Sequence, residues 1–415
     1  MSVPVMLLEA AGPESEALAR TAAAAGHPVH AVTDAATLAS YSGELRQLLE
    51  GCLVTGFTRP GQAVADITGY GRRIGVKALL TVNEYLTEVA ARSCAALGLP
   101  GNDPERAAAA RNKALMATAF EAGHVTMPRT KAVADLRELR GLHEAGAVGF
   151  PCVVKPADGA GSAGVTVVTG PEELEPAWHA ARTARVMYGM LRDERILVQE
   201  HVQGREFSVE YITQHDVTTH LCITRKHTTS GIHRVELGHT LPARLPAAAE
   251  RALLEQAGRA IAAVGVRNGA THTELVLSPD GRCTVLEIGA RLGAGHIGVL
   301  MQHALGIDPW RTVWDIALGR PVTITQAPGG YATVRFLTTH HAGRLVAVTG
   351  LPAVTTTIPA VRVRAAEGSD VGPATSNRGR LGHVIVTGHD PRTVDERADQ
   401  ILRQITITVA PGSRT

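Results

Sequence analysis

The sequence predicts a protein of mixed fold class, an α/β domain followed by α+β domains. Over the first 100 residues, short apolar runs alternate with helical segments, an order typical of a parallel sheet covered by helices. Beyond residue 100, strand-like and helical segments follow one another without that regular alternation. The length of 415 residues is enough for two or three domains at about 100–200 residues each.

The composition excludes several classes of protein. Hydrophobic residues make up 45% and charged residues 19% of the chain, as in an ordinary folded protein. The net charge of +2 provides no broad field for nucleic acid or a membrane surface. The start lacks a signal-like segment, and no run of about 18 apolar residues predicts a membrane span. Five scattered cysteines without a C-x-x-C pair indicate reduced thiols, so we expect a cytoplasmic protein without nucleic-acid or membrane partners.

The predicted α/β domain begins with a buried strand over residues 3–8. The stretch PESEALARTAAAAGH then predicts a helix, because acidic residues occupy its first turn and a glycine lies near its end. Further strands are expected at VHAVT, CLVT and ALLTV. A helical stretch over residues 83–97 precedes the turn-rich GLPGNDPE, which marks a domain boundary.

The remaining elements fit α+β domains. An Ala-rich helix is expected over residues 104–122, and strands at 128–133 and 150–155 with a helix between them. Residues 196–277 mix strands with one clear helix at 247–264, and a single helix is expected at 296–318. From residue 330 onward come strand-like pieces and a helix near 391–405, which predict a smaller α+β unit.

The stretch VVKPADGAGSAGVTVV combines a lysine with a glycine-rich loop. It satisfies G-x-G-x-x-G as a string, but a β-branched run follows where a dinucleotide-binding loop would open a helix. It also fails as a P-loop, because Val165 follows Gly164 where lysine is needed. The pattern therefore predicts a β-hairpin whose backbone N–H groups and Ser162 hydroxyl fold over phosphates, with Lys155 aimed at the same phosphates.

Together with a second lysine motif, this hairpin resembles the ATP-grasp superfamily over nearly the whole chain. RNKALM matches that family's D-K-x-x-[MF] helix, with Lys113 as the phosphate-binding lysine and Asn112 in place of the usual acid. VVKP matches the second lysine, Lys155, and the glycine lid corresponds to residues 159–164. Its expected ATP contacts are Gly161, Ser162, Ala163 and Gly164.

The resemblance implies an ATP-grasp fold in four parts. These are an N-terminal Rossmann-like pre-ATP-grasp domain at 1–100, a subdomain with the lysines and lid at 101–195, a subdomain with the hinge, metal and substrate site at 196–329, and a small C-terminal α+β subdomain at 330–415. In the hinge LVQEHVQGREFSVEYI, the resemblance assigns Glu200 and Val202 to the adenine through their backbone, Gln199 to its amino edge and Glu206 to the ribose.

Two glutamates resemble the family's metal ligands. Glu274 and Glu287 flank a DG turn, and antiparallel pairing would bring their carboxylates together. Adjacent anions are unfavourable without a cation, and Mg²⁺ prefers carboxylate and phosphate oxygens. We therefore expect ATP and Mg²⁺, with two ions, although Gly289 stands where many relatives have the Asn ligand. By the same resemblance, Arg291 is catalytic with Lys155 and neutralises the phosphate being transferred.

The stretch GIHRVELGHTLPARL resembles the E-x-x-H segment of bacterial L-amino-acid ligases, which form dipeptides. The resemblance places Glu236 and His239 at the amino group of the first amino acid, with Arg291 also at the substrate. Lys226, in TRKHTTSG, is expected to be a solvated lysine rather than a substrate contact. Arg378 and Arg380, in SNRGRLGHVIVTG, are expected to form a basic turn.

The family chemistry implied is phosphorylation of a carboxylate by ATP, then attack of an amine on the acyl-phosphate, with release of ADP and phosphate. Two alternatives remain: an ATP-grasp enzyme acting on another carboxylate or on bicarbonate, and a non-catalytic nucleotide-binding protein. The Glu236-x-x-His239 pattern favours an amino-acid substrate over the former. The expected partners are small-molecule amino acids, and the resemblance implies a homodimer through the N-terminal domain.

Overall fold

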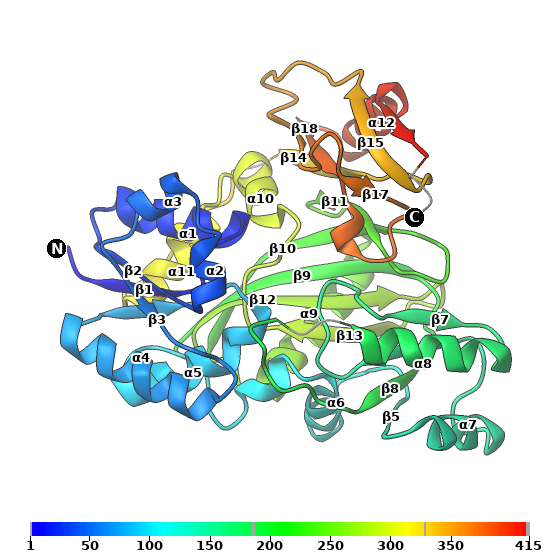
Figure 1. The fold of residues 1–415 in the computed structure, drawn as a ribbon, viewed down its shortest axis with the longest axis horizontal. Helices are drawn as coiled ribbons and strands as arrows, with labels where there is room; N and C mark the ends of the chain where they lie inside the picture. The colour runs from blue at the N-terminus through cyan, green and yellow to red at the C-terminus, as the bar shows by residue number, and fades with distance from the viewer. Residues whose placement is uncertain (1, 185–186, 328, 412–415) are drawn as a thin grey trace.

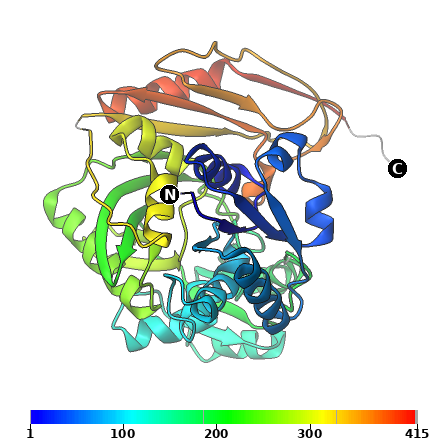
Figure 2. The same cartoon turned by 90° about the vertical axis from the view of Figure 1, so that its left-hand side faces the viewer.

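The computed structural model describes residues 2–184, 187–327 and 329–411. It contains four sheets, and Figure 1 shows how they are arranged. The N-terminal sheet and its helices lie on the left, the largest sheet crosses the centre, and the C-terminal elements lie above it. Turned by 90°, the same molecule shows the C-terminal strands and helix α12 across the top, with the N-terminal domain facing the viewer (Figure 2).

The N-terminal domain is the expected α/β unit. Its strands, β1 (Val5–Leu8), β2 (Val29–Thr33), β3 (Gly51–Val54) and β4 (Ala78–Leu80), form a parallel sheet in the order β3-β2-β1-β4. Its helices are α1 (Pro13–Ala24), α2 (Ala35–Ala39), α3 (Gly43–Gln47), α4 (Pro60–Ile74) and, after η1 (Glu84–Leu86), α5 (Thr87–Leu97). Because helices cover both faces, every side chain of β1 is buried, which explains its uninterrupted apolar sequence.

The second part has its own antiparallel sheet in the order β5-β8-β6-β7. Its elements are α6 (Lys113–Ala122), β5 (Thr130–Val133), α7 (Leu136–Glu144), β6 (Cys152–Pro156), β7 (Thr166–Val168), η3 (Pro171–Glu173), α8 (Leu174–Thr183) and β8 (Ile196–Glu200). Strand β8 pairs with both β5 and β6. The boundary expected after residue 195 therefore belongs after Glu200.

The helix expected over residues 104–122 is broken, contrary to the prediction. A short 3₁₀ turn, η2 (Ala107–Ala110), precedes α6, and the chain leaves helical geometry at Asn112. The Asn112 side chain accepts hydrogen bonds from the N–H groups of Ala114 and Leu115 and caps α6. Lys113 is consequently the first helical residue rather than one in the middle of a helix.

The largest sheet has eight antiparallel strands in the order β13-β12-β9-β10-β11-β14-β18-β16. The part before residue 330 supplies β9 (Arg205–Gln214), β10 (Val217–Thr228), β11 (Glu236–Leu241), β12 (Gly269–Leu277) and β13 (Cys283–Gly289). Helix α9 (Ala247–Ala263) packs on β12 and β13 through a core that includes Leu253, Ile261 and Val285. The other face of these two strands carries the polar side chains described below.

Residues 296–318 form two helices rather than the single helix expected. Helix α10 (Ile297–Leu305) ends at Gly306, which has φ +66°, and α11 (Pro309–Ala317) begins after Asp308. The Asp308 side chain accepts from the N–H of Arg311, and Pro309 occupies the first helical position. A left-handed glycine, an N-cap aspartate and a proline are the usual signals for ending one helix and starting another.

The C-terminal part is α+β as expected, but it is continuous with the largest sheet. Its elements are β14 (Tyr331–Leu337), β15 (Gly343–Thr349), β16 (Ala360–Val363), β17 (Asp370–Val371), η4 (Asn377–Gly379), β18 (Gly382–Gly388), α12 (Pro391–Gln404) and β19 (Thr406–Ala410). β14 pairs with β11, and β18 and β16 extend the sheet further. β17, β15 and β19 form a separate small sheet. In the part of the chain that the structure describes, no helix is long and apolar enough to cross a membrane.

Candidate active site

A cavity of about 380 Å³ lies where the four parts of the chain meet. Its wall includes side chains from the N-terminal domain, the glycine hairpin, the largest sheet and the C-terminal part. The sequence-predicted residues that line it are Lys113, Lys155, Gly161, Ser162, Ala163, Gln199, Glu200, Val202, Glu206, Glu236, His239, Glu274, Glu287 and Arg291. Gly164 is different: it packs on α8, where a Cβ atom would lie 2.9 Å from the carbonyl oxygen of Ala180.

The glycine-rich stretch forms the predicted hairpin. β6 and β7 pair antiparallel, with Cys152 opposite Val168 and Val154 opposite Thr166. In the connecting loop, Gly161 and Ser162 both have φ near +60°, so the chain turns through left-handed geometry. The hairpin thus lies over one side of the cavity and exposes backbone there.

The two predicted lysines differ in what they contact. The Lys113 ammonium group donates to the carbonyl oxygen of Gly159 at 2.8 Å and pairs with Glu287 at 3.2 Å. Burial lowers the pKa of Lys113, but the carboxylates of Glu287, Glu84 and Glu274 together outweigh that effect, so the net shift is upward. Lys155 is 5% exposed, and burial lowers its pKa to about 8. Within the described residues, the Lys155 ammonium group has no hydrogen bond or ion pair, which leaves its charge for a ligand.

The two predicted metal ligands face each other as expected. Glu274 of β12 is paired in register with Glu287 of β13. The Glu274 carboxylate contacts the Lys226 ammonium at 2.7 Å and Nε2 of His272 at 3.1 Å. Burial raises the pKa of Glu274, but Lys226 and His272 outweigh it and hold that pKa well below its usual range. This carboxylate is therefore ionised and available to a cation.

His272 connects Glu274 to a deeper carboxylate. Its Nδ1 lies 2.8 Å from Glu210, whose other contact is the hydroxyl of Ser208 at 2.7 Å. Burial opposes the charge of His272, yet the two flanking carboxylates raise its pKa to about 10. The imidazole is consequently a buried cation that lies between Glu210 and Glu274 and orients the Glu274 carboxylate.

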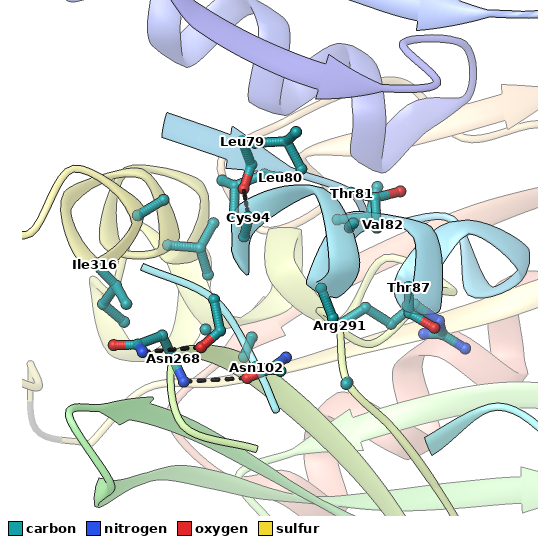
Figure 3. A pocket seen from close by; sticks show the side chains of 18 of the residues that line it. Leu79, Leu80, Thr81, Val82, Thr87, Cys94, Asn102, Asn268, Arg291 and Ile316 are labelled. Atoms are coloured by element: carbon teal, nitrogen blue, oxygen red, sulfur yellow. Dashed lines mark hydrogen bonds between the residues drawn. The ribbon is translucent and has the colours of Figure 1, made fainter. Parts of the chain in front are cut away.

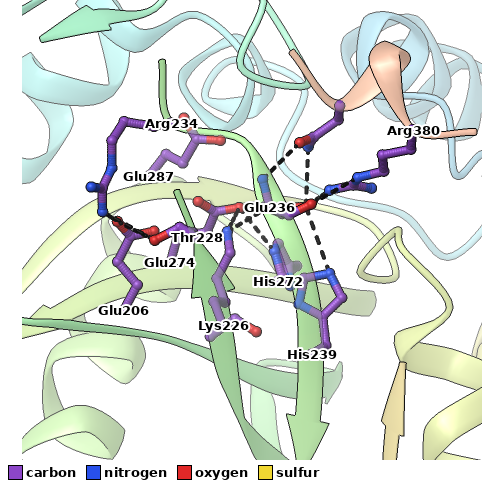
Figure 4. Close-up of polar contacts among 12 residues, drawn as sticks. Glu206, Lys226, Thr228, Arg234, Glu236, His239, His272, Glu274, Glu287 and Arg380 are labelled. Atoms are coloured by element: carbon purple, nitrogen blue, oxygen red, sulfur yellow. Dashed lines mark hydrogen bonds and ion pairs between the residues drawn. The ribbon is translucent and has the colours of Figure 1, made fainter. Parts of the chain in front are cut away.

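Lys226 is buried, so the expectation of a solvated lysine was wrong. Its side chain is 2% exposed, and its ammonium lies 2.7 Å from both Glu236 and Glu274 (Figure 4). Both carboxylates raise its pKa against the opposing effect of burial. One fixed positive charge therefore joins the predicted metal ligand to the predicted substrate ligand.

Arg380 is also part of the site rather than of an exposed basic turn. Its guanidinium donates to the Glu236 carboxylate at 2.6 Å and to the Glu236 carbonyl oxygen at 3.0 Å (Figure 4). The guanidinium also lies 3.8 Å from the centre of the Phe336 ring. The Asn377 amide donates to the same carboxylate at 3.0 Å. The neighbouring Arg378 is exposed and matches the expectation.

His239 is 1% exposed, and neither ring nitrogen has a hydrogen-bond partner within the described residues. Its Nε2 lies 3.6 Å from the Glu236 carboxylate. Burial lowers the pKa of His239, so the ring is neutral and has one donor and one acceptor nitrogen. An unpartnered buried imidazole is unfavourable, which fits a polar ligand at this place.

The predicted nucleotide contacts have protein partners in the structure. The carboxylate of Glu206, expected at the ribose, pairs with Arg234 (Figure 4). Gln199 donates its amide to the hydroxyl of Thr130 at 2.9 Å, and the N–H of Glu200 donates to the carbonyl oxygen of Arg129 at 2.9 Å. A bound ribose would therefore have to replace or share the Arg234 contact.

Arg291 reaches the site from the loop after β13 and pairs with Glu84 of the N-terminal domain. It also donates to the carbonyl oxygen of Leu292 at 2.9 Å. On its far side lies a second, smaller cavity of about 60 Å³, where Arg291, Thr87 and Cys94 lie near the bonded pair Asn102 and Asn268 (Figure 3). Arg291 thus lines both cavities.

The side chains and backbone groups of the cavity fit a nucleoside triphosphate with a hard divalent cation. Lys155 has an unused charge, the hairpin presents backbone to the cavity, and Glu274 and Glu287 lie side by side. No group of three or more His, Cys, Asp or Glu residues in the described chain would enclose a metal alone. A cation held by the two glutamates therefore needs further oxygens, which phosphates supply.

Several site residues were not predicted as such: Glu84, Lys226, Arg234, His272, Asn377 and Arg380. One signal was available for Lys226, because Cys222, Thr224 and Lys226 alternate on one buried face of β10. Glu84 and Asn377 come from parts of the chain far from their partners Arg291 and Glu236. No short sequence motif predicts contacts between residues so far apart in the chain.

The comparisons with known proteins agree with this geometry. The family description "ATP-grasp domain" matches residues 148–299, and "L-amino acid ligase C-terminal domain 2" matches residues 335–410. The alanine–anticapsin ligase of Bacillus subtilis (strain 168) is 26% identical over 269 residues, and carnosine synthase 1 of Gallus gallus is 30% identical over 190 residues. These alignments cover 61% and 44% of this chain, but only 57% and 20% of the two relatives.

Solved structures show the same fold over the whole chain. The L-amino acid ligase from Bacillus licheniformis superimposes with a TM-score of 0.82 at 20% identity, covering 99% of each chain. The phosphoribosylglycinamide synthetase from Anaerococcus prevotii superimposes with a TM-score of 0.74 at 17% identity, covering 99% of this chain and 100% of that one. The predicted ATP-grasp fold is confirmed. The chain therefore contains an ATP-grasp domain over residues 148–299 and an L-amino acid ligase C-terminal domain over residues 335–410.

Proposed function

We propose that the protein is an ATP- and Mg²⁺-dependent carboxylate–amine ligase. It joins an L-amino acid, or a close analogue, to an amine-bearing partner and releases ADP and phosphate. The observation that supports this most is the convergence of two lysines, two glutamates and an arginine in one cavity under a glycine hairpin: Lys113, Lys155, Glu274, Glu287 and Arg291. The relatives named above as amino-acid ligases are consistent with it.

In the nucleotide half, Lys155 and Lys113 bind the phosphates and the hairpin covers them. Lys155 is the better placed of the two in the present arrangement, because Lys113 is engaged by Gly159 and Glu287. Gln199, Glu200, Val202 and Glu206 line the part of the cavity assigned to adenine and ribose. Positioned cations stabilise the charge that develops in phosphoryl transfer.

Glu274 and Glu287 are the residues that would hold the Mg²⁺ ions, and His272 keeps the Glu274 carboxylate oriented. When bound, these ions neutralise charge on the transferring phosphate. Arg291 acts on the same charge once its guanidinium faces the phosphate rather than Glu84.

In the substrate half, Glu236 and His239 receive the amino group of the first amino acid. A carboxylate has about four acceptor positions, and Lys226, Arg380 and Asn377 already donate to this one. The ammonium group of a substrate takes the position that remains, and the neutral imidazole of His239 accepts beside it. The substrate's carboxylate then points toward the phosphates, and an amine completes the amide by expelling phosphate.

The product of the reaction tests this proposal. The protein is incubated with ATP, Mg²⁺ and pairs of amino acids, and the nucleotide and organic products are resolved. The expected result is ADP and phosphate, formed only when both amino acids are present, with a product lighter than their sum by one water. ADP formed with bicarbonate or with one carboxylate alone would indicate a different acceptor. Tight nucleotide binding without turnover for any pair would contradict a ligase.

A further inference from the structure

Asn377 touches both halves of the cavity. It is the first residue of η4, in the C-terminal part, and it lines the cavity wall. Its backbone N–H donates to the carbonyl oxygen of Gly161 in the glycine hairpin at 3.2 Å. Its side-chain oxygen accepts from the N–H of Glu236 at 3.1 Å, and its side-chain nitrogen donates to the Glu236 carboxylate at 3.0 Å.

The segment that carries Asn377 is fixed to the rest of the C-terminal part. Arg380 holds the backbone and the carboxylate of Glu236 and stacks on Phe336 of β14. Arg364, just beyond β16, donates to the carbonyl oxygens of Arg378 at 2.9 Å and Arg380 at 2.6 Å. These contacts hold the segment around Asn377 in place independently of the hairpin.

The hairpin, in contrast, has few attachments to the other side of the cavity. Besides the Asn377 contact, the Lys113 ammonium donates to the carbonyl oxygen of Gly159 at 2.8 Å, at the start of the loop, and the N–H of Val167 in β7 donates to the carbonyl oxygen of Ile232 at 2.9 Å. Gly161 itself meets no atom within 4 Å of the position a Cβ atom would take, so packing does not hold it. The two ends of the loop are thus held at Gly159 and Gly164, and the hydrogen bond from Asn377 restrains the tip between them at Gly161.

We propose that Asn377 is a positioning residue that couples the amino-acid site at Glu236 to closure of the glycine hairpin. The Asn377 side chain accepts one hydrogen bond from Glu236 and donates another to it. These two bonds fix the direction of the Asn377 backbone N–H, which in turn holds the hairpin tip. When Glu236 is in place for the substrate, the hairpin is closed over the phosphates. The C-terminal part then contributes directly to the site by holding Glu236 and the hairpin together through Asn377.

The consequence for the reaction depends on the proposed function. The acyl-phosphate carbon is attacked either by the amine, which forms the amide, or by water, which returns the free amino acid. In both cases the bond from the acyl carbon to the phosphate oxygen breaks and phosphate leaves. A closed hairpin excludes water and so favours the amine. Loss of the Asn377 contacts should therefore raise the amount of ADP released per amide formed.

The experiment compares Asn377→Ala with Thr375→Ala, since Thr375 is exposed in the same loop and its side chain makes no hydrogen bond to any described residue. Hydrogen exchange of the segment 159–164 is measured in the unliganded proteins. We expect exchange to be about tenfold faster in Asn377→Ala, as for loss of one or two net hydrogen bonds, and unchanged in Thr375→Ala. Equal exchange in the wild type and Asn377→Ala would overturn the proposal that Asn377 restrains the hairpin, whatever reaction the enzyme catalyses.

A second readout concerns the reaction. In the presence of a productive substrate pair, the ratio of ADP to amide should be near one in the wild type and in Thr375→Ala, and severalfold higher in Asn377→Ala. A wild-type protein that forms no amide would contradict the proposed function. The hydrogen-exchange result would still test whether Asn377 restrains the hairpin. A fall in kcat with the ratio unchanged would assign Asn377 a purely structural role. If Asn377→Ala does not fold, Asn377→Asp replaces it, since its carboxylate repels that of Glu236 and predicts the same changes.

Discussion

The Nζ atom of Lys226 lies 2.7 Å from the carboxylate of Glu274, the first of the two proposed metal ligands. The same atom lies 2.7 Å from Glu236 in the proposed amino-acid site. Phosphate chemistry and substrate recognition therefore share one buried cation. A change at Lys226 alters both halves of the cavity, which makes it the natural place to begin testing the account.

Replacing Lys226 by methionine should strongly destabilise the protein. The methionine fills a similar volume but leaves Glu236 and Glu274 buried without their shared cation, and breaking a buried ion pair costs about 3–5 kcal/mol. Denaturant unfolding measures the free-energy change. Lys131→Met, at an exposed strand position, is the control and should stay within about 0.5 kcal/mol of the wild type. Similar small effects in both variants would show that Lys226 is not a structural cation.

The charge on His272 predicts a pH dependence of stability. Its pKa is raised to about 10 in the folded protein, so its contribution is fully present below the unfolded value of about 6.5. It is lost as the pH rises between those values, at about 1.4 kcal/mol per pH unit. The difference in unfolding free energy between the wild type and His272→Gln should therefore shrink from pH 6.5 to pH 10.

His179→Gln is the matched control for that titration, because His179 is exposed on α8. Its difference from the wild type should stay small and constant over the same range. A pH-independent difference for His272→Gln would mean that His272 is not a buried cation between Glu210 and Glu274.

Nucleotide affinity should fall at alkaline pH because Lys155 loses its proton. Burial lowers its pKa to about 8, and phosphate binds the ammonium form. Above that pH, the affinity for ADP without metal should decrease by up to about tenfold per pH unit. Calorimetric titrations from pH 7 to pH 9.5 measure this. In Lys155→Arg the charge persists and the slope should vanish; an equal slope in both proteins would assign the dependence to another group.

Removing the two proposed metal ligands should abolish turnover. It should also lower the free energy of unfolding, because Glu274 neutralises the buried Lys226 and His272, so activity is compared under conditions in which the variant is folded. Glu274→Gln combined with Glu287→Gln keeps the shape of the β12–β13 hairpin but removes the anions that hold Mg²⁺. ADP formation should fall by more than about 100-fold, as expected when charge stabilisation in the transition state is lost. Glu255→Gln, on the exposed face of α9, should retain full activity. Mg²⁺-dependent ADP formation by the double variant would contradict the assignment.

The sequence was informative where local signals decide the structure. The hairpin that carries Lys155, the pairing of Glu274 with Glu287 and the parallel N-terminal sheet all follow from short-range patterns, and the structure confirms them. The helix boundaries at Asn112 and Gly306 were not predicted, although asparagine is a common N-cap residue and glycine commonly follows the end of a helix.

The contacts that complete the site were beyond such reasoning. Glu84 meets Arg291 across 207 positions of the chain, and Asn377 meets Glu236 across 141. Whether Lys226 is solvated or buried depends on which face of β10 meets the cavity, and that depends on the neighbouring strands. Only the assembled sheets place these groups together.

Transfer of a labelled oxygen from the amino acid to the released phosphate shows whether the substrate carboxylate is phosphorylated. An amino acid with both carboxylate oxygens replaced by ¹⁸O is incubated with ATP, Mg²⁺, an amine partner and the protein, and the phosphate released is analysed by mass spectrometry. The account predicts one ¹⁸O atom in each phosphate formed with the amide, because the carboxylate oxygen stays on phosphorus when the amine displaces it. Unlabelled phosphate alongside labelled amide would show that the carboxylate is never phosphorylated, and would contradict the proposed ligase mechanism.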